Sequence, residues 1–213
     1  MKSSSTLNKS VIRGYFYLSV LLVLYVFCRC LNVGFTHDES LSYTLITGND
    51  TQAYTANNHW LNTILMFLSS KIFGYSELAL RLPNLLALIV YLVYVYRIFH
   101  QFGSNSWAFI IALPFLVLNP FILDFFGLAR GYGLGIAFFT AALYYFMMYF
   151  MKRQLRNYLI LSVVFSLCCI YSNYAFLTAL LAVQCALFVG FLSIHKKQWK
   201  QLSLVYLTEA ILL

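Results

Sequence analysis

Long apolar runs separated by short polar breaks dominate this chain. A helix needs about 20 apolar residues to cross the hydrocarbon core of a bilayer. The pattern predicts an all-α protein, a polytopic transmembrane helical bundle. The runs that we interpret as spans cover residues 14–31, 76–99, 106–126, 131–151, 157–172 and 175–193, and a partial span begins near Leu202.

The apolar run from 157 to 193 is too long for one span. As a single helix it would reach about 55 Å, whereas the hydrocarbon core is about 30 Å thick. Ser172-Asn173 interrupts this run with two polar residues. We therefore expect two spans joined by a tight turn at these residues.

The last apolar run begins near Leu202 and is too short to cross a bilayer before Leu213. We interpret residues 1–213 as a single membrane domain and expect the protein to be truncated here, with further spans after Leu213. A continuing reading frame would test this expectation.

Residues 59–74 differ from the other apolar runs. Their polar positions (59, 62, 63, 69 and 70) recur at helical spacing, and as a helix they would cover only about 24 Å. This pattern is typical of a helix that lies in the membrane interface. We expect it within an outer loop spanning residues 32–75.

The loop charges favour the same arrangement. If 59–74 does not cross and the N-terminus is cytoplasmic, ten of the 14 lysines and arginines lie on the cytoplasmic side; if it crosses, only six do. Cytoplasmic loops of membrane proteins collect Lys and Arg. We therefore expect an integral, multi-pass protein with a cytoplasmic N-terminus, whose residues 32–75 lie on the periplasmic, extracellular or lumenal side.

Composition excludes most other classes of protein. Apolar residues make up 62% of the chain and charged residues 9%, against about 45–50% and 25% in soluble domains. The net charge is 14 − 6 = +8, but the basic residues lie between apolar runs and form no patch. We expect membrane lipid as a partner and no nucleic acid.

The acidic residues are distributed unevenly. In the favoured topology, five of the six fall on the outer side, and ionisable groups near lipid are costly to keep without a function. This distribution predicts a site at the outer face. The five acidic residues are Asp38, Glu39, Asp50, Glu77 and Asp124.

Thr36-His37-Asp38-Glu39 has the pattern of a capping box, with Thr36 as N-cap and Glu39 reaching back. Two interpretations of the acidic pair stay open. Asp38 and Glu39 either serve only the start of a short helix, where the helix dipole favours acidic side chains, or carry catalytic chemistry.

The order of four features along the chain resembles a known family. They are the Asp-Glu pair after the first span, a long outer loop with a His, the block FGYSELALRLPNLL (73–86) and the segment LARGYGL (128–134). This order resembles the membrane glycosyltransferases of the GT-C class. It is most similar to dolichyl-phosphate-mannose protein mannosyltransferases and bacterial lipid A aminoarabinose transferases, over about residues 34–150.

The resemblance implies a function. Family members take a single sugar from an isoprenoid-phosphate (polyprenyl-phosphate) donor, and an acidic residue of the first outer loop is the base. On this chain that residue is Asp38, with Glu39 beside it. An attacking hydroxyl loses its proton to such a carboxylate, and in-line displacement inverts the anomeric centre. The donor is a substrate and no cofactor is implied; the acceptor stays open between protein, lipid and glycan.

His59 stands where the family usually has His or Lys followed by two prolines, but here Trp60-Leu61 follows. Two interpretations are balanced. His59 contacts the lipid phosphate or the acceptor, or it is an interfacial His beside an anchoring Trp.

Glu77 and Arg81 are four residues apart, in the order that favours an ion pair on one helix face. Arg81 is therefore either half of a local pair or a phosphate-binding residue that faces a cavity.

Arg130 is the strongest candidate for binding the donor phosphate. It precedes a helix N-terminus with glycines at 131, 133 and 135, where free N–H groups and the helix dipole favour an anion. The same glycines also suit close packing between helices. Tyr132 is a candidate substrate-binding residue because it adjoins Arg130. The segment after Arg130 lacks the acidic motif of metal-dependent GT-C enzymes, so we expect no metal.

Two rival functions stay open. A transporter or flippase needs polar groups near the bilayer midplane, and the predicted spans carry few. A non-catalytic membrane subunit or fragment is the other rival, and the Trp60-Leu61 departure favours it slightly.

Overall fold

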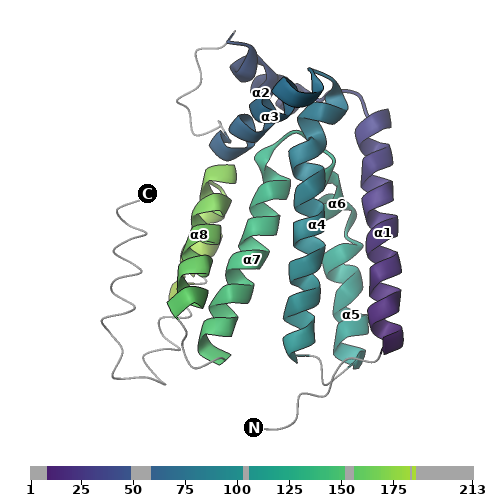
Figure 1. The fold of residues 1–213 in the computed structure, drawn as a ribbon, viewed down its shortest axis with the longest axis vertical. Helices are drawn as coiled ribbons and strands as arrows, with labels where there is room; N and C mark the ends of the chain where they lie inside the picture. Colours follow the sequence, from purple (N-terminus) through teal and green to yellow (C-terminus); the bar gives the residue numbers. More distant parts are fainter. Residues whose placement is uncertain (1–8, 49–58, 103–105, 152–155, 183, 186–213) are drawn as a thin grey trace.

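The computed structural model describes residues 9–48, 59–102, 106–151, 156–182, 184 and 185 (Figure 1). These residues form helices and turns and contain no strand, so the all-α prediction is confirmed for them. The elements are α1 (Lys9–Asn32), α2 (His37–Thr47), α3 (Trp60–Phe73), α4 (Glu77–Phe102), α5 (Ser106–Val117), α6 (Pro120–Phe126), α7 (Gly131–Met151) and α8 (Arg156–Ser172).

Three helices of the described part are long and apolar enough to cross a membrane, namely Lys9–Asn32, Glu77–Gln101 and Gly131–Met151. They coincide with the predicted spans at 14–31, 76–99 and 131–151. α8 is apolar but shorter, with a length of about 26 Å at 1.5 Å per residue. These helices indicate a membrane protein.

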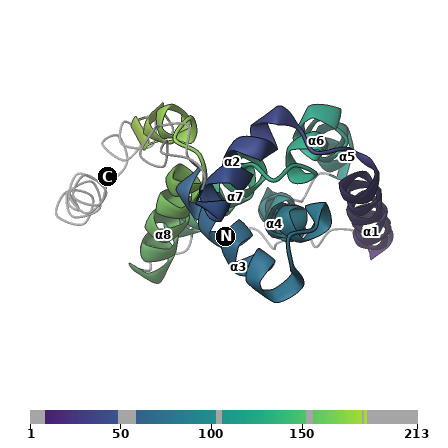
Figure 2. The ribbon, with the colours of Figure 1, turned by 90° about the horizontal axis from the view of Figure 1, so that it is seen from above.

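The long helices pack as neighbours in one layer. α4 lies between α1 and α7, and α7 lies between α4 and α8, while α5 and α6 cover the side of α1 and α4 (Figures 1 and 2). Val26, Leu88, Phe126 and Ala137, from four different helices, are fully buried where these elements meet. This core fixes the N-terminal end of α7, which Arg130 directly precedes.

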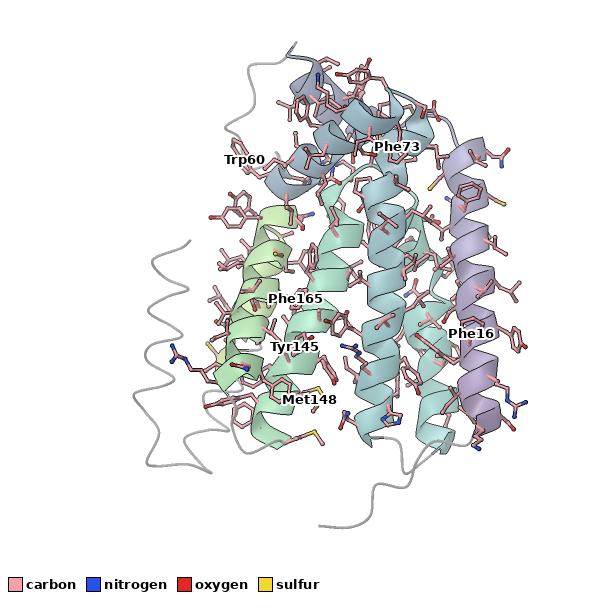
Figure 3. All side chains as sticks on the ribbon, in the orientation of Figure 1. Phe16, Trp60, Phe73, Tyr145, Met148 and Phe165 are labelled. Atoms are coloured by element: carbon pink, nitrogen blue, oxygen red, sulfur yellow. The ribbon has the colours of Figure 1, made fainter. Side chains whose placement is uncertain are left out.

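Apolar side chains also cover the outside of the bundle. Tyr145 of α7 and Phe165 of α8 stack between two helices with ring centroids 5.5 Å apart, whereas Phe16 of α1 points away from the bundle with 63% of its surface exposed (Figure 3). An apolar exterior of this kind suits contact with lipid tails, which are as apolar as a leucine side chain.

The run 106–126, which we expected to form one helix, forms two. α5 ends at Val117 and α6 begins at Pro120. Proline lacks an N–H donor and disfavours helical backbone in the residue before it. Asn119 is accordingly extended, and its side chain caps α6 by accepting a hydrogen bond from the Phe121 N–H at 3.0 Å. The Asn-Pro pair was the sequence signal for this break.

Helices α2 and α3 lie at one end of the bundle, beside the N-termini of α4 and α7 and the C-terminus of α1 (Figures 1 and 2). α3 runs across that end and is about 21 Å long. This arrangement agrees with a helix that does not cross; its depth in a bilayer and the side it faces stay predictions.

α8 ends at Ser172 and a tight turn follows over residues 173–175, as the polar break predicts. The Asn173 side-chain oxygen accepts a hydrogen bond from the Ala175 N–H at 2.9 Å and so starts the next helical segment. The expected span at 175–193 lies only partly within the described residues. The partial span from Leu202 and the acidic residue Asp50 lie outside them.

Candidate functional site

Buried polar side chains gather at the end of the bundle that carries α2 and α3. Such groups are costly to bury unless they are hydrogen-bonded or paired, so the partners of each group indicate its role. The residues with 4% or less of their surface exposed include Glu39, His59, Asn62, Arg81, Asn84, Arg130 and Asn173.

Arg81 and Glu39 form a fully buried ion pair. Arg81 Nε lies 2.7 Å from Glu39 Oε1, and Arg81 Nη2 lies 2.8 Å from Glu39 Oε2, with neither residue exposed. This two-pronged geometry is the strongest that a guanidinium and a carboxylate can form. The pair ties α2 to the N-terminal part of α4.

The rest of the Arg81 guanidinium holds the end of α1. It donates to the carbonyl oxygens of Cys30 at 2.9 Å, Val33 at 2.7 Å and Gly34 at 3.2 Å. Carbonyls at a helix C-terminus lack partners within the helix. The expected contact with Glu77 is present at 3.5 Å, but the half-exposed Glu77 is a secondary partner.

Glu39 completes the predicted capping box. Its Oε2 accepts from the Thr36 N–H at 2.9 Å, and its own N–H donates to Thr36 Oγ1 at 3.3 Å. Its Oε1 also accepts from the Ala129 N–H at 2.8 Å. Burial alone would raise the pKa of Glu39, but hydrogen bonds from Arg81, Ala129 and Thr36 outweigh it and hold the pKa below its ordinary value. Glu39 is therefore a charged anchor.

The segment before α7 is held from a second direction. The Ala129 carbonyl accepts from Asn62 Nδ2 at 3.2 Å, and Asn62 Oδ1 accepts from Asn84 Nδ2 at 2.8 Å. Asn84 Oδ1 in turn accepts from the Leu134 N–H at 3.1 Å. Sequence reasoning missed this network; its signal was two asparagines within apolar helical runs.

Arg130 lies beside Asp38, 92 residues away in the sequence. Arg130 Nη1 donates to the Asp38 backbone carbonyl at 3.2 Å, and Arg130 is 3% exposed. The Asp38 residue itself is exposed. The two candidates for base and phosphate ligand are thus neighbours, with the carboxylate residue at the surface and the guanidinium beneath it.

His59 and Tyr132 complete the group. Their ring centroids are 5.4 Å apart, and Tyr132 also stacks on Phe125 at 4.9 Å. His59 Nδ1 lies 3.1 Å from the Ser172 carbonyl oxygen. Burial lowers the pKa of His59, and the positive charge of Arg130 lowers it further. The Ser172 carbonyl and Asp38 raise it by less, so the pKa falls to about 4.

The three glycines of α7 serve close packing. A Cβ on Gly131 would overlap the Ser172 carbonyl oxygen and approach His59 Cβ to 2.9 Å. A Cβ on Gly133 would come within 2.8 Å of Asn84 Oδ1, and one on Gly135 would overlap the Phe176 ring. At least one N–H of this helix start, that of Leu134, is already used by Asn84.

The structure thus divides the six candidate residues into two groups. Asp38, His59, Arg130 and Tyr132 lie together at this end with only Asp38 exposed, whereas Glu39 and Arg81 form a separate buried pair. Among the described residues, no group of three or more His, Cys, Asp or Glu side chains is placed to hold a metal ion. The expectation of no metal stays a prediction.

The fold and the polar group define a helical membrane protein with a charged cluster at one end. Comparison with protein-family models, curated proteins and solved structures finds no match to this chain. Any more specific function is therefore a proposal, argued from the contacts of the residues at this end of the bundle.

Proposed function

We propose that this chain is the N-terminal part of a GT-C-type glycosyltransferase, which moves a single sugar from a polyprenyl-phosphate donor to an acceptor at the outer membrane face. One observation carries the proposal: the exposed Asp38 lies beside the buried Arg130 at one end of an apolar bundle. A lipid-borne phosphate reaches such a site from the membrane with its tail still in lipid.

In this mechanism Asp38 is the general base. The acceptor hydroxyl gives its proton to the Asp38 carboxylate while its oxygen bonds to the anomeric carbon. The bond from that carbon to the phosphate oxygen breaks, and its electron pair stays on the phosphate. Attack opposite the leaving group inverts the anomeric centre.

Arg130 stabilises the leaving phosphate. A guanidinium offers a planar fork to two phosphate oxygens, and the low-dielectric surroundings of a 97%-buried side chain strengthen that interaction. Tyr132, stacked on Phe125 and next to His59, provides an aromatic surface beside the guanidinium.

Glu39 and Arg81 act as positioning residues in this proposal. Their polar atoms bind one another, the end of α1 and the Ala129 N–H. Through Ala129 they fix the residue that precedes Arg130. In this proposal Glu39 is therefore not the base and Arg81 does not bind the phosphate; Asp38 and Arg130 have these two roles.

The test is transfer by the natural full-length protein in membranes, supplied with a radiolabelled polyprenyl-phosphate sugar. Asp38→Asn keeps the size of the side chain but removes the base, and transfer should fall by roughly 10²-fold or more. The matched control is Asp124→Asn, an exposed carboxylate at the same end that pairs with Arg29 at 3.1 Å.

The control should retain near-normal transfer. Full activity in Asp38→Asn would remove the assigned base. Absence of transfer in the wild-type protein with every sugar tried, together with donor binding, would favour a non-catalytic membrane subunit.

A further inference from the structure

The protonation of His59 can be assigned from its contacts. Its Nδ1 lies 3.1 Å from the Ser172 carbonyl oxygen, which can only accept a hydrogen bond. Nδ1 therefore carries the proton, and in the neutral ring Nε2 is left with a lone pair. His59 is 4% exposed, and its Nε2 has no hydrogen-bond partner among the described residues.

Asn173, one residue beyond the Ser172 carbonyl that binds His59, presents the opposite kind of group. Because Asn173 Oδ1 accepts from the Ala175 N–H at 2.9 Å, the amide orientation is fixed and Nδ2 is the donor. Asn173 is also 4% exposed, and Nδ2 has no hydrogen-bond partner within the described part of the chain.

The charged neighbours favour a neutral His59. The described titratable groups that face it are Arg130 before α7, Asp38 of α2 and Tyr132 of α7. The burial of the imidazole and the charge of Arg130 set its pKa at about 4, so the ring is uncharged near pH 7.

A phosphate oxygen and a neutral His59 do not fit each other. An ionised phosphate oxygen only accepts hydrogen bonds, and so does the bare Nε2, whereas the Arg130 guanidinium only donates. A hydroxyl group both donates and accepts. It can donate to His59 Nε2, and an oxygen of the same or an adjacent hydroxyl can accept from Asn173 Nδ2.

We infer that His59 Nε2 and Asn173 Nδ2 form a sugar-recognition subsite, which binds hydroxyl groups of the donor sugar while Arg130 binds the phosphate. This inference rests on the proposed function. A buried site built to hydrogen-bond hydroxyls rejects analogues that lack them, because its polar atoms are then left unpaired. The pair therefore selects the sugar.

Two substitutions separate this role from packing. His59→Asn retains an N–H at the reach of Nδ1, for the Ser172 carbonyl, and removes the Nε2 acceptor. Asn173→Asp retains the oxygen that caps Ala175 and replaces the donor with an acceptor. His100→Asn, at an exposed residue near the C-terminal end of α4, is the matched control.

The experiment measures binding to the full chain in nanodiscs with two kinds of probe. One is polyprenyl phosphate alone, and the other is polyprenyl phosphate carrying glucose or mannose. Loss of one hydrogen bond should weaken binding of the sugar-bearing probe by roughly three- to tenfold in His59→Asn and in Asn173→Asp. Affinity for polyprenyl phosphate alone should not change in His59→Asn, and His100→Asn should match the wild-type protein.

Other outcomes overturn the inference in distinguishable ways. Equal weakening for both probes assigns His59 to the phosphate, and no change for either assigns the pair to packing. If the wild-type chain binds polyprenyl phosphate equally well with and without the sugar, the sugar subsite is wrong but the phosphate site still stands. Failure of the wild-type chain to bind either probe removes the proposed function as well.

Nitrogen NMR of the wild-type chain labelled at histidine tests the tautomer without any substitution. The expected spectrum at neutral pH has His59 protonated at Nδ1 and bare at Nε2. A proton on Nε2 at neutral pH overturns the inference even where the variants fail to fold.

Discussion

The Glu39–Arg81 pair shows how strongly one buried residue depends on another. Each charge is removed from water, so each needs its partner to offset the lost hydration. Arg81 also holds three carbonyls at or just after the C-terminal end of α1, so its loss should affect α1, α2 and α4 together.

Arg81→Met should destabilise the protein by about 3–5 kcal/mol, because it leaves Glu39 as an uncompensated buried charge. The double variant Arg81→Met with Glu39→Gln should lose less, because the orphaned charge is gone. Thermal unfolding in detergent measures both. A double variant as unstable as the sum of its two single variants would contradict a direct coupling.

Glu39 also predicts how stability depends on pH. Its pKa in the folded protein is lower than the ordinary value of 4.5, so the folded state resists protonation more than the unfolded state does. The stabilisation is therefore present above about pH 4.5 and is lost as the pH falls through the lowered pKa. Melting temperatures measured from neutral to acidic pH should fall less steeply for Glu39→Gln than for the wild-type protein. Parallel curves would contradict this.

Arg130 carries a prediction about the kind of positive charge that the site needs. Lys offers a point charge where Arg offers a fork for two oxygens. Arg130→Lys should weaken binding of polyprenyl phosphate, and Arg130→Ala should weaken it roughly ten- to a hundredfold, the equivalent of a charge-assisted hydrogen bond of about 1.5–3 kcal/mol. Titration of donor and acceptor separately tests this. A loss confined to acceptor affinity would assign Arg130 to the acceptor.

At the scale of elements, the approach of α7 to α8 depends on Gly131. Its missing side chain leaves room for the Ser172 carbonyl, which is backbone and cannot turn away. Gly131→Ala should therefore force the two helices apart and cost about 1–3 kcal/mol. Gly14→Ala in α1 is the control, because a Cβ there meets nothing within 4 Å.

Gly14→Ala should be neutral or stabilising, by up to about 1 kcal/mol, since alanine favours helix over glycine. Unfolding measurements on both variants in the same detergent compare the two positions. Equal effects would mean that the α7–α8 approach is less tight than the structure has it.

The positions of the helices could largely be predicted from the sequence, but the side-chain contacts between helices could not. Apolar length identifies α1, α4 and α7 because membrane helices satisfy their own backbone hydrogen bonds. The capping box at Thr36 was also predictable because it is local. Arg81 was paired with Glu77 because sequence spacing reveals only neighbours on one helix; Glu39, 42 residues away, becomes its main partner only through the packing of α2 on α4.

The whole molecule carries a prediction of orientation. Lys71 and Glu77 are exposed at the end with α2 and α3, while Lys9 and Arg156 are exposed at the other end (Figure 1). With the native cysteines replaced, a cysteine at Lys71 should react with an impermeant thiol reagent added outside, and one at Arg156 should not. Labelling of Arg156→Cys alone would reverse the orientation and place Asp38 and Arg130 in the cytoplasm.

The peptide group of Ala129 is held on both sides, by Glu39 through its N–H and by Asn62 through its carbonyl. Both anchors leave the ribosome before residue 129 is made, and domains form from the N-terminus as synthesis proceeds. Arg81 is also made earlier, so the ion pair can lock α2 onto α4 while α7 is still inside the ribosome. Arg130 would then enter a site whose other residues are already in place. A nascent chain halted once all of α4 has left the ribosome, but before α7 has emerged, should already shield α2 from protease.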